Sequence, residues 1–347
     1  MNGNGQSATL PEDGEKRAEL KDQPTRLYIG IVDKGDLHIG NYLGAVSNWA
    51  KLIPHYDCIY CVVDYHAITI DYQPDAMREA VLDTATMGIA CGLDPERCTL
   101  FVQSHVTETL ELAWVFSTVT ALGALERMTQ FKDKAIQHKQ NINAGLFTYP
   151  ILQAADILGV KADAVPVGDD QSQHLELTRE IARRFNHLYG PIFPEAKTLY
   201  SPAPRIMGLD GQSKMSKSQG NYIAMKDSSD TVRKKLSTAF TDPNRLRKSD
   251  PGNPDICNIF TLHKSFSSTD EIENIETECR SAGIGCVDCK AKLGINMEGT
   301  IRPIQEKYED LRQRPNDVKD ALAAGAGRVR ALTKETMTKV RHNLGIR

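Results

Sequence analysis

Four short apolar runs without polar–apolar alternation constrain the fold of this chain most strongly. They cover residues 27–32, 58–63, 99–102 and 164–167. Such runs are typical of strands buried on both faces of a parallel sheet. Between them, residues 40–53 and 76–91 carry apolar side chains at helical spacing. Strands that alternate with helices predict a doubly wound α/β domain with a parallel sheet, which binds its ligand beyond the carboxyl ends of the strands.

Composition divides the chain into three parts. Residues 1–24 contain few apolar side chains and predict a disordered leader. The strand signal fades after the stretch 210–220, and residues 228–347 read as helices separated by Pro and Gly breaks such as the one at 250–254. We therefore expect an α/β domain over 25–227 and a helical domain over 228–347.

Charge and hydropathy exclude several classes of protein. No apolar run approaches the roughly 18 to 20 residues that span a bilayer, and the first 24 residues lack the apolar segment of a signal peptide. Eight cysteines in a chain without such a signal argue against a secreted disulfide scaffold. We expect a cytoplasmic protein that does not enter a membrane.

The charge at the C-terminal end of the chain is compatible with a polyanion partner, whereas the net charge of the whole chain gives no sign of one. The chain has 42 Lys and Arg against 45 Asp and Glu, a net charge of -3. Its last 47 residues hold 11 basic and 6 acidic side chains, a local balance of +5 (11 minus 6). This asymmetry fits a polyanion, and it equally fits a solvated pair of amphipathic helices.

The first candidate motif follows the first predicted strand. There a glycine-containing turn leads into a helix that opens at about Gly40. Free backbone N–H groups and the helix dipole favour a phosphate at such a position. Gly40 leaves room for a nucleobase, while His38 and Asn41 can donate hydrogen bonds to phosphate oxygens as charge develops. An ordinary helix cap would give the same short run.

The second candidate motif is the string Lys-Met-Ser-Lys-Ser at residues 214–218, within a loop flanked by glycines. Two lysines on a movable loop, Lys214 and Lys217, suit a pyrophosphate leaving group, since they can close on it in the transition state. A solvated loop is the alternative for any pair of lysines.

Together these motifs resemble the two signatures of class I aminoacyl-tRNA synthetases. From about residue 27 to the C-terminus the chain resembles the tryptophanyl-tRNA synthetase family. The segments that carry the resemblance are 38–44, 63–69, 126–132, 148–150, 154–158, 165–171 and 174–179.

The resemblance implies a Rossmann-like catalytic domain that includes the 214–218 loop, followed by a helical anticodon-binding domain. It implies a Mg²⁺-dependent ligase that activates L-tryptophan with ATP and charges tRNA(Trp). It further implies a homodimer with no DNA or membrane partner.

The resemblance also assigns roles to residues. Asp156 would accept the indole N–H, and its apolar surroundings agree with a buried carboxylate, although a surface carboxylate is the alternative. An unmet buried donor costs roughly 1 to 3 kcal/mol, so a fixed acceptor discriminates between amino acids. The other implied tryptophan contacts are Tyr28, His66, Val165 and Val167 as walls, with Tyr149 and Gln171 at the amino group. The implied ATP contacts are Gly168, Asp169, Asp170, Ile206, Met215, Ser216 and Ser218, with Lys134 at the phosphates.

Two positions depart from the family pattern. Val32, Asp33 and Lys34 stand where the family usually has Gln-Pro-Thr or Gln-Pro-Ser, so contacts to ATP can be expected only through the charge of Lys34. Gln153 stands at a pocket position that is commonly Met, and a Gln three residues before an Asp is also how tyrosyl enzymes bind a phenol. A tyrosine-specific synthetase therefore remains the alternative, as does a regulatory protein that binds tryptophan or an adenylate.

Four cysteines form a separate constellation in the helical part. Cys257, Cys279, Cys286 and Cys289 have 21, 6 and 2 residues between them. Four thiolates suit tetrahedral zinc or a four-iron cluster, and four free thiols are the alternative. The spacing resembles that of the tryptophanyl enzymes with a 4Fe–4S centre, which favours iron over zinc. Cysteines 58, 61, 91 and 98 are predicted core residues.

Overall fold

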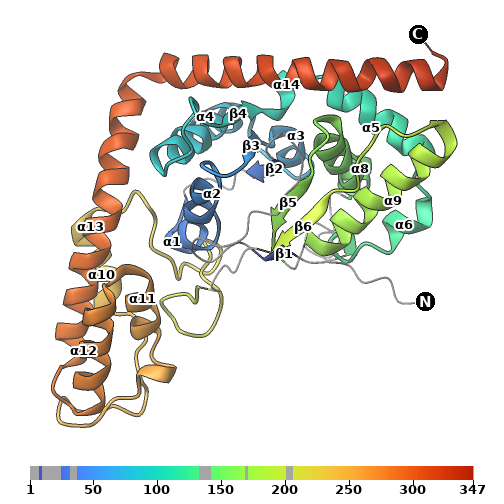
Figure 1. The fold of residues 1–347 in the computed structure, drawn as a ribbon. Coiled ribbons are helices and arrows are strands. Elements are labelled where there is room, and N and C mark those ends of the chain that lie inside the picture. The colour runs from blue at the N-terminus through green and yellow to red at the C-terminus, as the bar shows by residue number, and fades with distance from the viewer. Residues whose placement is uncertain are drawn as a thin grey trace.

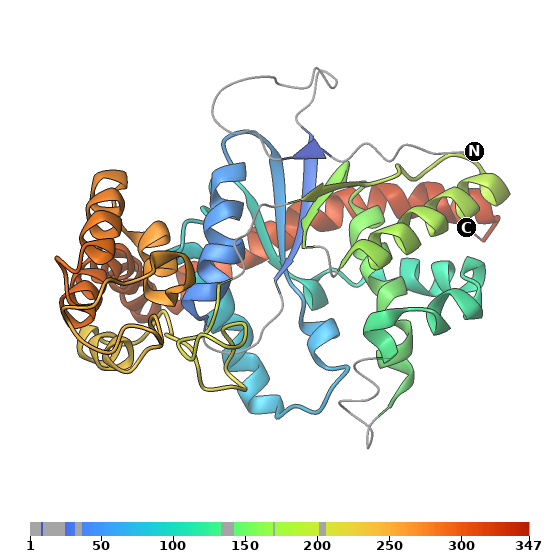
Figure 2. The same cartoon turned by 90° about the horizontal axis from the view of Figure 1, so that it is seen from below.

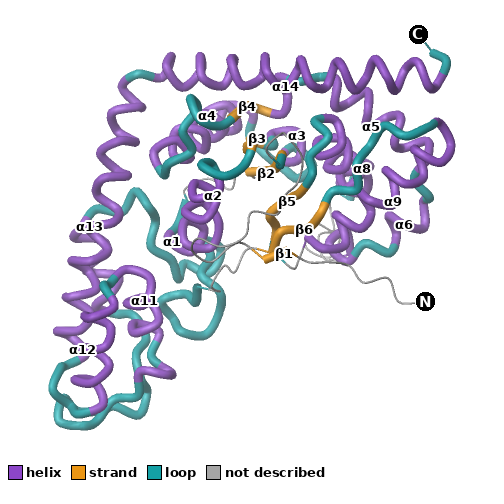
Figure 3. The backbone as a smooth tube through the Cα atoms, viewed as in Figure 1, coloured by secondary structure: helices purple, strands orange, loops and turns teal. Residues whose placement is uncertain are grey.

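The computed structural model describes residues 8–9, 25–31, 37–132, 142–168, 171–200 and 206–346. Among these residues a six-stranded parallel sheet has the order β1-β6-β5-β2-β3-β4. The strands are β1 Ala8–Thr9, β2 Arg26–Ile31, β3 Asp57–Val62, β4 Thr99–Val102, β5 Ala164–Val167 and β6 Lys197–Tyr200. Figure 3 shows them gathered at the centre of one unit with helices around them. The predicted doubly wound parallel sheet is thus confirmed.

The four predicted strands correspond to β2, β3, β4 and β5, whereas β1 and β6 were not predicted. Ala8–Thr9 lies within the segment expected to be a disordered leader, yet it pairs with Leu199 and Tyr200. Two residues are too few to show a period in sequence, and the strand depends on backbone bonds to its neighbour. Residues 1–7 and 10–24 lie outside the described residues.

The helices of the α/β unit surround this sheet. They are α1 Ile39–Asn41, the π-helical η1 Tyr42–Val46, α2 Ser47–Leu52, α3 Asp64–Ala67, α4 Pro74–Ala90, the 3₁₀ turn η2 Gln103–His105, α5 Glu108–Val119, α6 Leu122–Glu126, α8 Ala144–Gly159 and α9 Ser172–Tyr189. The predicted helix over 40–53 is therefore present with a π-helical segment in its middle, and the one over 76–91 corresponds to α4.

Residues 228–346 form helices separated by loops, as predicted. Their helices are α10 Ser229–Ser237, the 3₁₀ turn η4 Pro254–Ile256, α11 Asn258–Phe266, α12 Thr269–Arg280, α13 Cys286–Gln313 and α14 Pro315–Leu344. Figure 1 shows α10 to α13 forming a unit beside the sheet, and α14 turning back across the α/β unit. Figure 2 shows the same helix crossing behind the strands.

Helix α14 lies in the sequence range expected for the helical domain, but it packs into the core of the α/β unit. Val318, Leu322 and Val329 are buried against the sheet side of the molecule. A Cβ atom at Gly325 would lie 1.9 Å from the carbonyl oxygen of Leu100, so only glycine allows this approach to β4. The helical unit beside the sheet therefore ends near residue 313.

The same packing gives partners to much of the basic C-terminal segment. Arg328 donates to the carbonyl oxygens of Pro95 and Cys98, and Arg341 forms an ion pair with Glu111. The positive balance of the last 47 residues thus serves contacts within the chain at these positions. In the described part of the chain, no helix is long and apolar enough to cross a membrane.

Candidate active site

The order of the strands creates a topological switch point between β2 and β5, where a ligand crevice is expected. The chain runs from β2 to β3 and β4 on one side of the sheet, and from β5 to β6 on the other. At such a switch point the two connections leave in opposite directions, and a ligand can bind beyond the carboxyl ends of the strands. Tyr28 on β2 and Val165 on β5 are both buried here.

A buried carboxylate lies at the floor of this crevice. Tyr149, Gln153 and Asp156 are four and three residues apart on α8 and therefore share one face of the helix. Asp156 is only 3% exposed. It accepts a hydrogen bond from Gln103 Nε2 at 2.7 Å, and His66 Nε2 lies 3.1 Å away. Two donors thus hold the carboxylate in place, as a fixed acceptor requires.

Aromatic and polar side chains form the walls above Asp156. His66 and Tyr149 meet edge to face with ring centroids 6.1 Å apart. Tyr149 Oη lies 2.8 Å from His174 Nε2, and burial raises the pKa of Tyr149 to about 12. Gln153 Nε2 donates to Gln171 Oε1 at 3.5 Å.

Tyr28 closes the pocket from β2. Burial, followed by the nearby Asp156 carboxylate, raises the pKa of Tyr28 well above its ordinary value, so its hydroxyl stays protonated. Val165 is buried on β5 and Val167 is half-buried. The structure therefore brings together the eight residues expected to contact the amino acid.

Sequence reasoning did not assign a role to two residues of this pocket, Gln103 and His174. Gln103 is 1% exposed and follows the last residue of β4. A polar side chain directly after a buried parallel strand points toward a site, and this signal could have identified it. The ring of His174 lies against Tyr149, with the ring centroids 5.4 Å apart.

The first motif forms a helix start, as expected. His38 is the N-cap of α1: its Nδ1 accepts from the backbone N–H of Asn41, whose Oδ1 in turn lies 3.5 Å from the His38 backbone nitrogen. A Cβ at Gly40 would lie 3.0 Å from His38 Nδ1, so glycine leaves free space beside the histidine ring.

The second motif belongs to a loop organised by Asp210 and Asn221. Asn221 Oδ1 accepts from the backbone N–H of Ser216 at 2.8 Å, while its Nδ2 donates to Asp210 Oδ2 at 2.9 Å. Hydrogen bonds lower the pKa of Asp210, and the largest contribution comes from the backbone N–H of Gln212. Lys214 is exposed and Ser218 is also at the surface, whereas Ile206 and Met215 are buried beneath them.

Backbone pairing joins the two motifs. The Ile39 N–H donates to Ile223 O at 3.0 Å, and the Met225 N–H donates to Leu37 O at 2.8 Å. A Cβ at Gly40 would also lie 3.4 Å from Met215 Cβ. The segment after the second motif therefore lies directly beside the segment that carries the first.

Several expected site residues cannot be compared with the structure. Val32, Asp33, Lys34, Lys134, Asp169 and Asp170 lie outside the described residues. Gly168 is described, and its carbonyl accepts from the Gln171 N–H at 3.1 Å at the end of β5.

The four cysteines of the helical unit lie near one another. Cys257 is the N-cap of α11, Cys279 lies in the last turn of α12, and Cys286 and Cys289 lie in the first turn of α13. Burial, and then the three neighbouring thiols, raise the pKa of Cys289 to about 12. All four are free, and in the described ranges no three His, Cys, Asp or Glu side chains are arranged as ready metal ligands.

Two further side chains, to which the sequence analysis assigned no role, lie close to these thiols. Arg245 Nη1 lies 3.9 Å from Cys279 Sγ and 4.0 Å from Cys286 Sγ. His263 Nε2 lies 3.1 Å from the Cys289 carbonyl oxygen and 3.4 Å from its Sγ, so this nitrogen carries the ring proton. A Cβ at Gly252 would lie 2.5 Å from Cys279 Sγ. A cation, an N–H donor and a side-chain-free position suit a group of thiolates.

The other four cysteines are core residues, as predicted. Cys58, Cys61, Cys91 and Cys98 are buried. Burial is the main cause that raises the pKa of each, which agrees with inert thiols.

The fold and the two joined motifs are those of a class I aminoacyl-tRNA synthetase. The family described as "tRNA synthetases class I (W and Y)" matches residues 20–301. The chain belongs to this family.

Individual relatives cover nearly the whole chain. A tryptophan–tRNA ligase of Deinococcus radiodurans is 48% identical over 92% of this chain and 98% of its own length. One of Thermotoga maritima is 41% identical over 92% and 99%. The crystal structure of the Campylobacter jejuni tryptophanyl-tRNA synthetase, complexed with ADP and tryptophan, is 33% identical, with a TM-score of 0.86 over 92% of this chain and 100% of the other. A tyrosyl-tRNA synthetase of Archaeoglobus fulgidus, 21% identical with a TM-score of 0.66, is similar in fold alone.

Proposed function

We propose that this chain is a tryptophan–tRNA ligase, which forms tryptophanyl-adenylate from L-tryptophan and ATP and transfers the amino acid to tRNA(Trp). The observation that carries the proposal is the buried Asp156 carboxylate, held by Gln103 and His66 at the floor of the crevice. One fixed, buried acceptor suits an indole, whose single polar atom is a donor. The names of the relatives support tryptophan over the tyrosine and regulatory alternatives.

The chemistry assigned to the site is nucleotidyl transfer. The carboxylate oxygen of tryptophan forms a bond to the α-phosphorus of ATP, and the bond from that phosphorus to the β-bridging oxygen breaks, which releases pyrophosphate. His38 and Asn41 would donate to the α-phosphate as charge develops, while Lys214 and Lys217 would stabilise the leaving group. Bound Mg²⁺ would neutralise phosphate charge. Positioning and electrostatic stabilisation supply most of the acceleration in such transfers.

The experiment that tests this function is amino-acid-dependent exchange of pyrophosphate into ATP, measured with each of the twenty amino acids. We expect exchange with tryptophan. Exchange with tyrosine alone would establish the tyrosyl alternative, and tryptophan binding without any exchange would establish the regulatory one. Charging of tRNA(Trp) transcripts then tests the second step.

We further propose that Cys257, Cys279, Cys286 and Cys289 hold a 4Fe–4S cluster, with zinc as the alternative metal. Support comes from the convergence of the thiols, from the Arg245 cation beside two of them, and from the side-chain-free position at Gly252. Such a cluster would tie the starts of α11 and α13 to the end of α12.

Replacing Cys286 with serine is expected to lower iron content from about four atoms per chain and to impair tRNA charging more than pyrophosphate exchange. The reason is that this cysteine lies in the helical unit, away from Asp156. Iron analysis and absorbance of anaerobically purified protein provide the measurement, with Cys91→Ala as the matched buried-thiol control. Zinc without colour in the parent protein would contradict the cluster, and equal loss of both activities would show that the metal is needed to fold the whole chain.

We propose that the helical unit over α10 to α13 binds the tRNA anticodon. The loop residues Leu246, Arg247 and Lys248 are exposed, and Val287 beside the cysteines is exposed as well. The Lys248–Asp288 ion pair at 3.3 Å brings this loop against the start of α13. Apolar and cationic side chains on one surface suit unstacked bases and their phosphates.

The reduced thiols and the need for ATP and tRNA favour the cytoplasm as the compartment.

We also propose that the protein is a homodimer. Leu110 and Trp114, four residues apart on α5, and Leu122 on α6 are all exposed, Trp114 to 73% and Leu122 to 64%. Large apolar side chains that gather at the surface of a folded protein often mark an interface.

Replacing Trp114 with glutamate is expected to convert the dimer to a monomer, because the proposed interface loses its aromatic anchor and gains a charge. Sedimentation velocity measures the change. Leu246→Glu, at another highly exposed apolar position on the helical unit, is the matched control and should remain dimeric. A parent protein that sediments as a monomer would refute the dimer.

A further inference from the structure

Helix α13 connects the cysteine site with the catalytic unit. Cys286 and Cys289 lie in its first turn, and Gln305 and Tyr308 lie toward its other end. Between them, Lys290 Nζ donates to the carbonyl oxygens of Ser237 and Ala239, 2.9 and 2.8 Å away. Figure 1 shows the helix running from the helical unit to the junction with α14.

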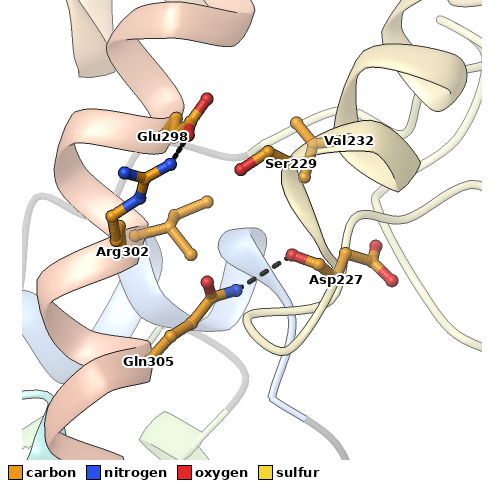
Figure 4. A pocket seen from close by; sticks show the side chains of 7 residues that line it. Asp227, Ser229, Val232, Glu298, Arg302 and Gln305 are labelled. Carbon is orange, nitrogen blue, oxygen red and sulfur yellow. Dashed lines mark hydrogen bonds and ion pairs between the residues drawn. The ribbon is translucent and has the colours of Figure 1, made fainter.

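Gln305 binds the backbone that follows the second motif. Its Nε2 donates to Met225 O at 2.7 Å and to Asp227 O at 2.9 Å. Figure 4 shows Gln305 pointing from α13 toward Asp227 across a small pocket beside α10. Met225 is also the residue whose N–H pairs with Leu37, one residue before His38. One amide group of α13 thus contacts the segment that joins both motifs.

A second set of contacts, one turn further along α13, fixes the same segment to α4. Tyr308 Oη donates to Asp83 Oδ1. Lys226 Nζ donates to both Asp83 oxygens, at 2.9 and 2.7 Å, and lies 4.8 Å above the centre of the Tyr308 ring. A shared carboxylate therefore joins α4, α13 and the residue between the two carbonyls that Gln305 binds.

We propose that Gln305 is a positioning residue, which together with the Tyr308–Asp83–Lys226 contacts sets the position of the 214–218 loop relative to the first motif. These side chains touch neither tryptophan nor ATP in the proposed site. They act on residues 223–227, whose backbone follows the loop and pairs with residues 37–39. The position of the helical unit is thereby transmitted to the lysines that bind the phosphates.

The kinetic consequence of this inference depends on the proposed function. If the segment 223–227 shifts, Lys214 and Lys217 shift relative to Gly40, whereas the Asp156 pocket on α8 does not. A defect should therefore appear in the use of ATP and spare the binding of tryptophan. A role limited to folding would lower stability without separating the two substrates.

Gln305→Glu tests the proposal, because it keeps the size of the side chain but places an oxygen against two carbonyl oxygens. We expect the KM for ATP in tryptophan-dependent pyrophosphate exchange to rise about fivefold or more, as loss of two hydrogen bonds allows, while the KM for tryptophan changes less than about twofold. Tyr308→Phe, which keeps the ring under Lys226, should raise the KM for ATP by about two- to threefold.

The matched control is Asn296→Asp on the same helix. Asn296 Nδ2 donates to Ser267 Oγ at 2.7 Å and to Glu271 Oε2 at 2.6 Å, inside the helical unit. This variant should lose stability to heat while its KM for ATP stays at the parent value. An equal rise of the KM for ATP in Asn296→Asp would overturn the proposal, as would unchanged values in both Gln305→Glu and Tyr308→Phe.

Hydrogen exchange of the Met225 amide provides a readout that does not depend on the reaction. In Gln305→Glu this amide should exchange about tenfold faster, since its partner segment opens more often. An unchanged rate of hydrogen exchange at Met225 would contradict the proposal. This holds even if the protein showed no pyrophosphate exchange with tryptophan. Failure of the proposed function would instead appear in the parent protein, as absence of tryptophan-dependent exchange.

Discussion

Replacing Asp156 with alanine is expected to lower kcat/KM for tryptophan in pyrophosphate exchange by roughly 10²- to 10³-fold. The indole N–H would lose its acceptor, and Gln103 Nε2, which now donates at 2.7 Å, would be left buried without this partner. Each unmet buried donor costs about 1 to 3 kcal/mol, so the two together account for the expected loss. Initial rates at varied tryptophan and saturating ATP measure it.

The matched control for this variant is Asp163→Ala. Asp163 Oδ2 also accepts a hydrogen bond, from the Arg26 N–H at 2.9 Å, but it lies at the opposite end of β2 from the crevice. It should leave the KM for tryptophan unchanged. A small effect of Asp156→Ala, within about threefold of the parent, would show that this carboxylate does not read the amino acid.

Replacing both Lys214 and Lys217 with alanine is expected to lower kcat for exchange by about 10²- to 10³-fold, the range observed for loss of a donor to transition-state charge. Tryptophan binding should be unchanged, because Asp156, Tyr149 and Gln171 lie in the crevice and not in the loop. Equilibrium dialysis of tryptophan and exchange kinetics separate the two effects.

Lys234→Ala serves as the control for this pair. Lys234 is exposed on α10, the helix that follows the loop, so its loss changes the charge of the region by one unit without touching the motif. We expect parent kinetics. A double loop variant with nearly parent kcat would contradict the assignment of pyrophosphate stabilisation to these lysines.

The core of the sheet could be predicted from sequence because four of its strands are largely buried. The runs at β2, β3, β4 and β5 show this directly, since 14 of their 20 residues are buried. Strand β6 contains Lys197 and Thr198, which break the apolar run, and the edge strand β1 has only two residues. The pairing of β1 with β6 joins residues 191 positions apart (199 minus 8), which no local pattern reveals.

The course of α14 could not be predicted for a related reason. Its sequence shows an amphipathic helix, but periodicity gives the face that is buried and not the element that covers it. The close approach of Gly325 to Leu100 O joins residues that are far apart along the chain. The sequence therefore did not reveal that α14 packs against β4 and α5.

The candidate site was predicted mainly through the two motifs and the resemblance that they carry. The resemblance named Tyr149, Gln153 and Asp156 without showing that they lie on one face of α8, as they do in the structure. Gln103, which orients Asp156, escaped notice because its contact spans 53 residues. Arg245 and Gln305 escaped notice for the same reason, since each acts on a segment far away in sequence.

The account depends on one spatial relation, in which the turn at Gly40 and the lysines at 214 and 217 bind one triphosphate. A crystal structure with tryptophan and a non-hydrolysable ATP analogue tests it most directly. We predict that the α-phosphate lies beside His38 and the Gly40 backbone, with the β- and γ-phosphates beside Lys214 and Lys217. Phosphates bound away from either segment in the closed complex would contradict the account.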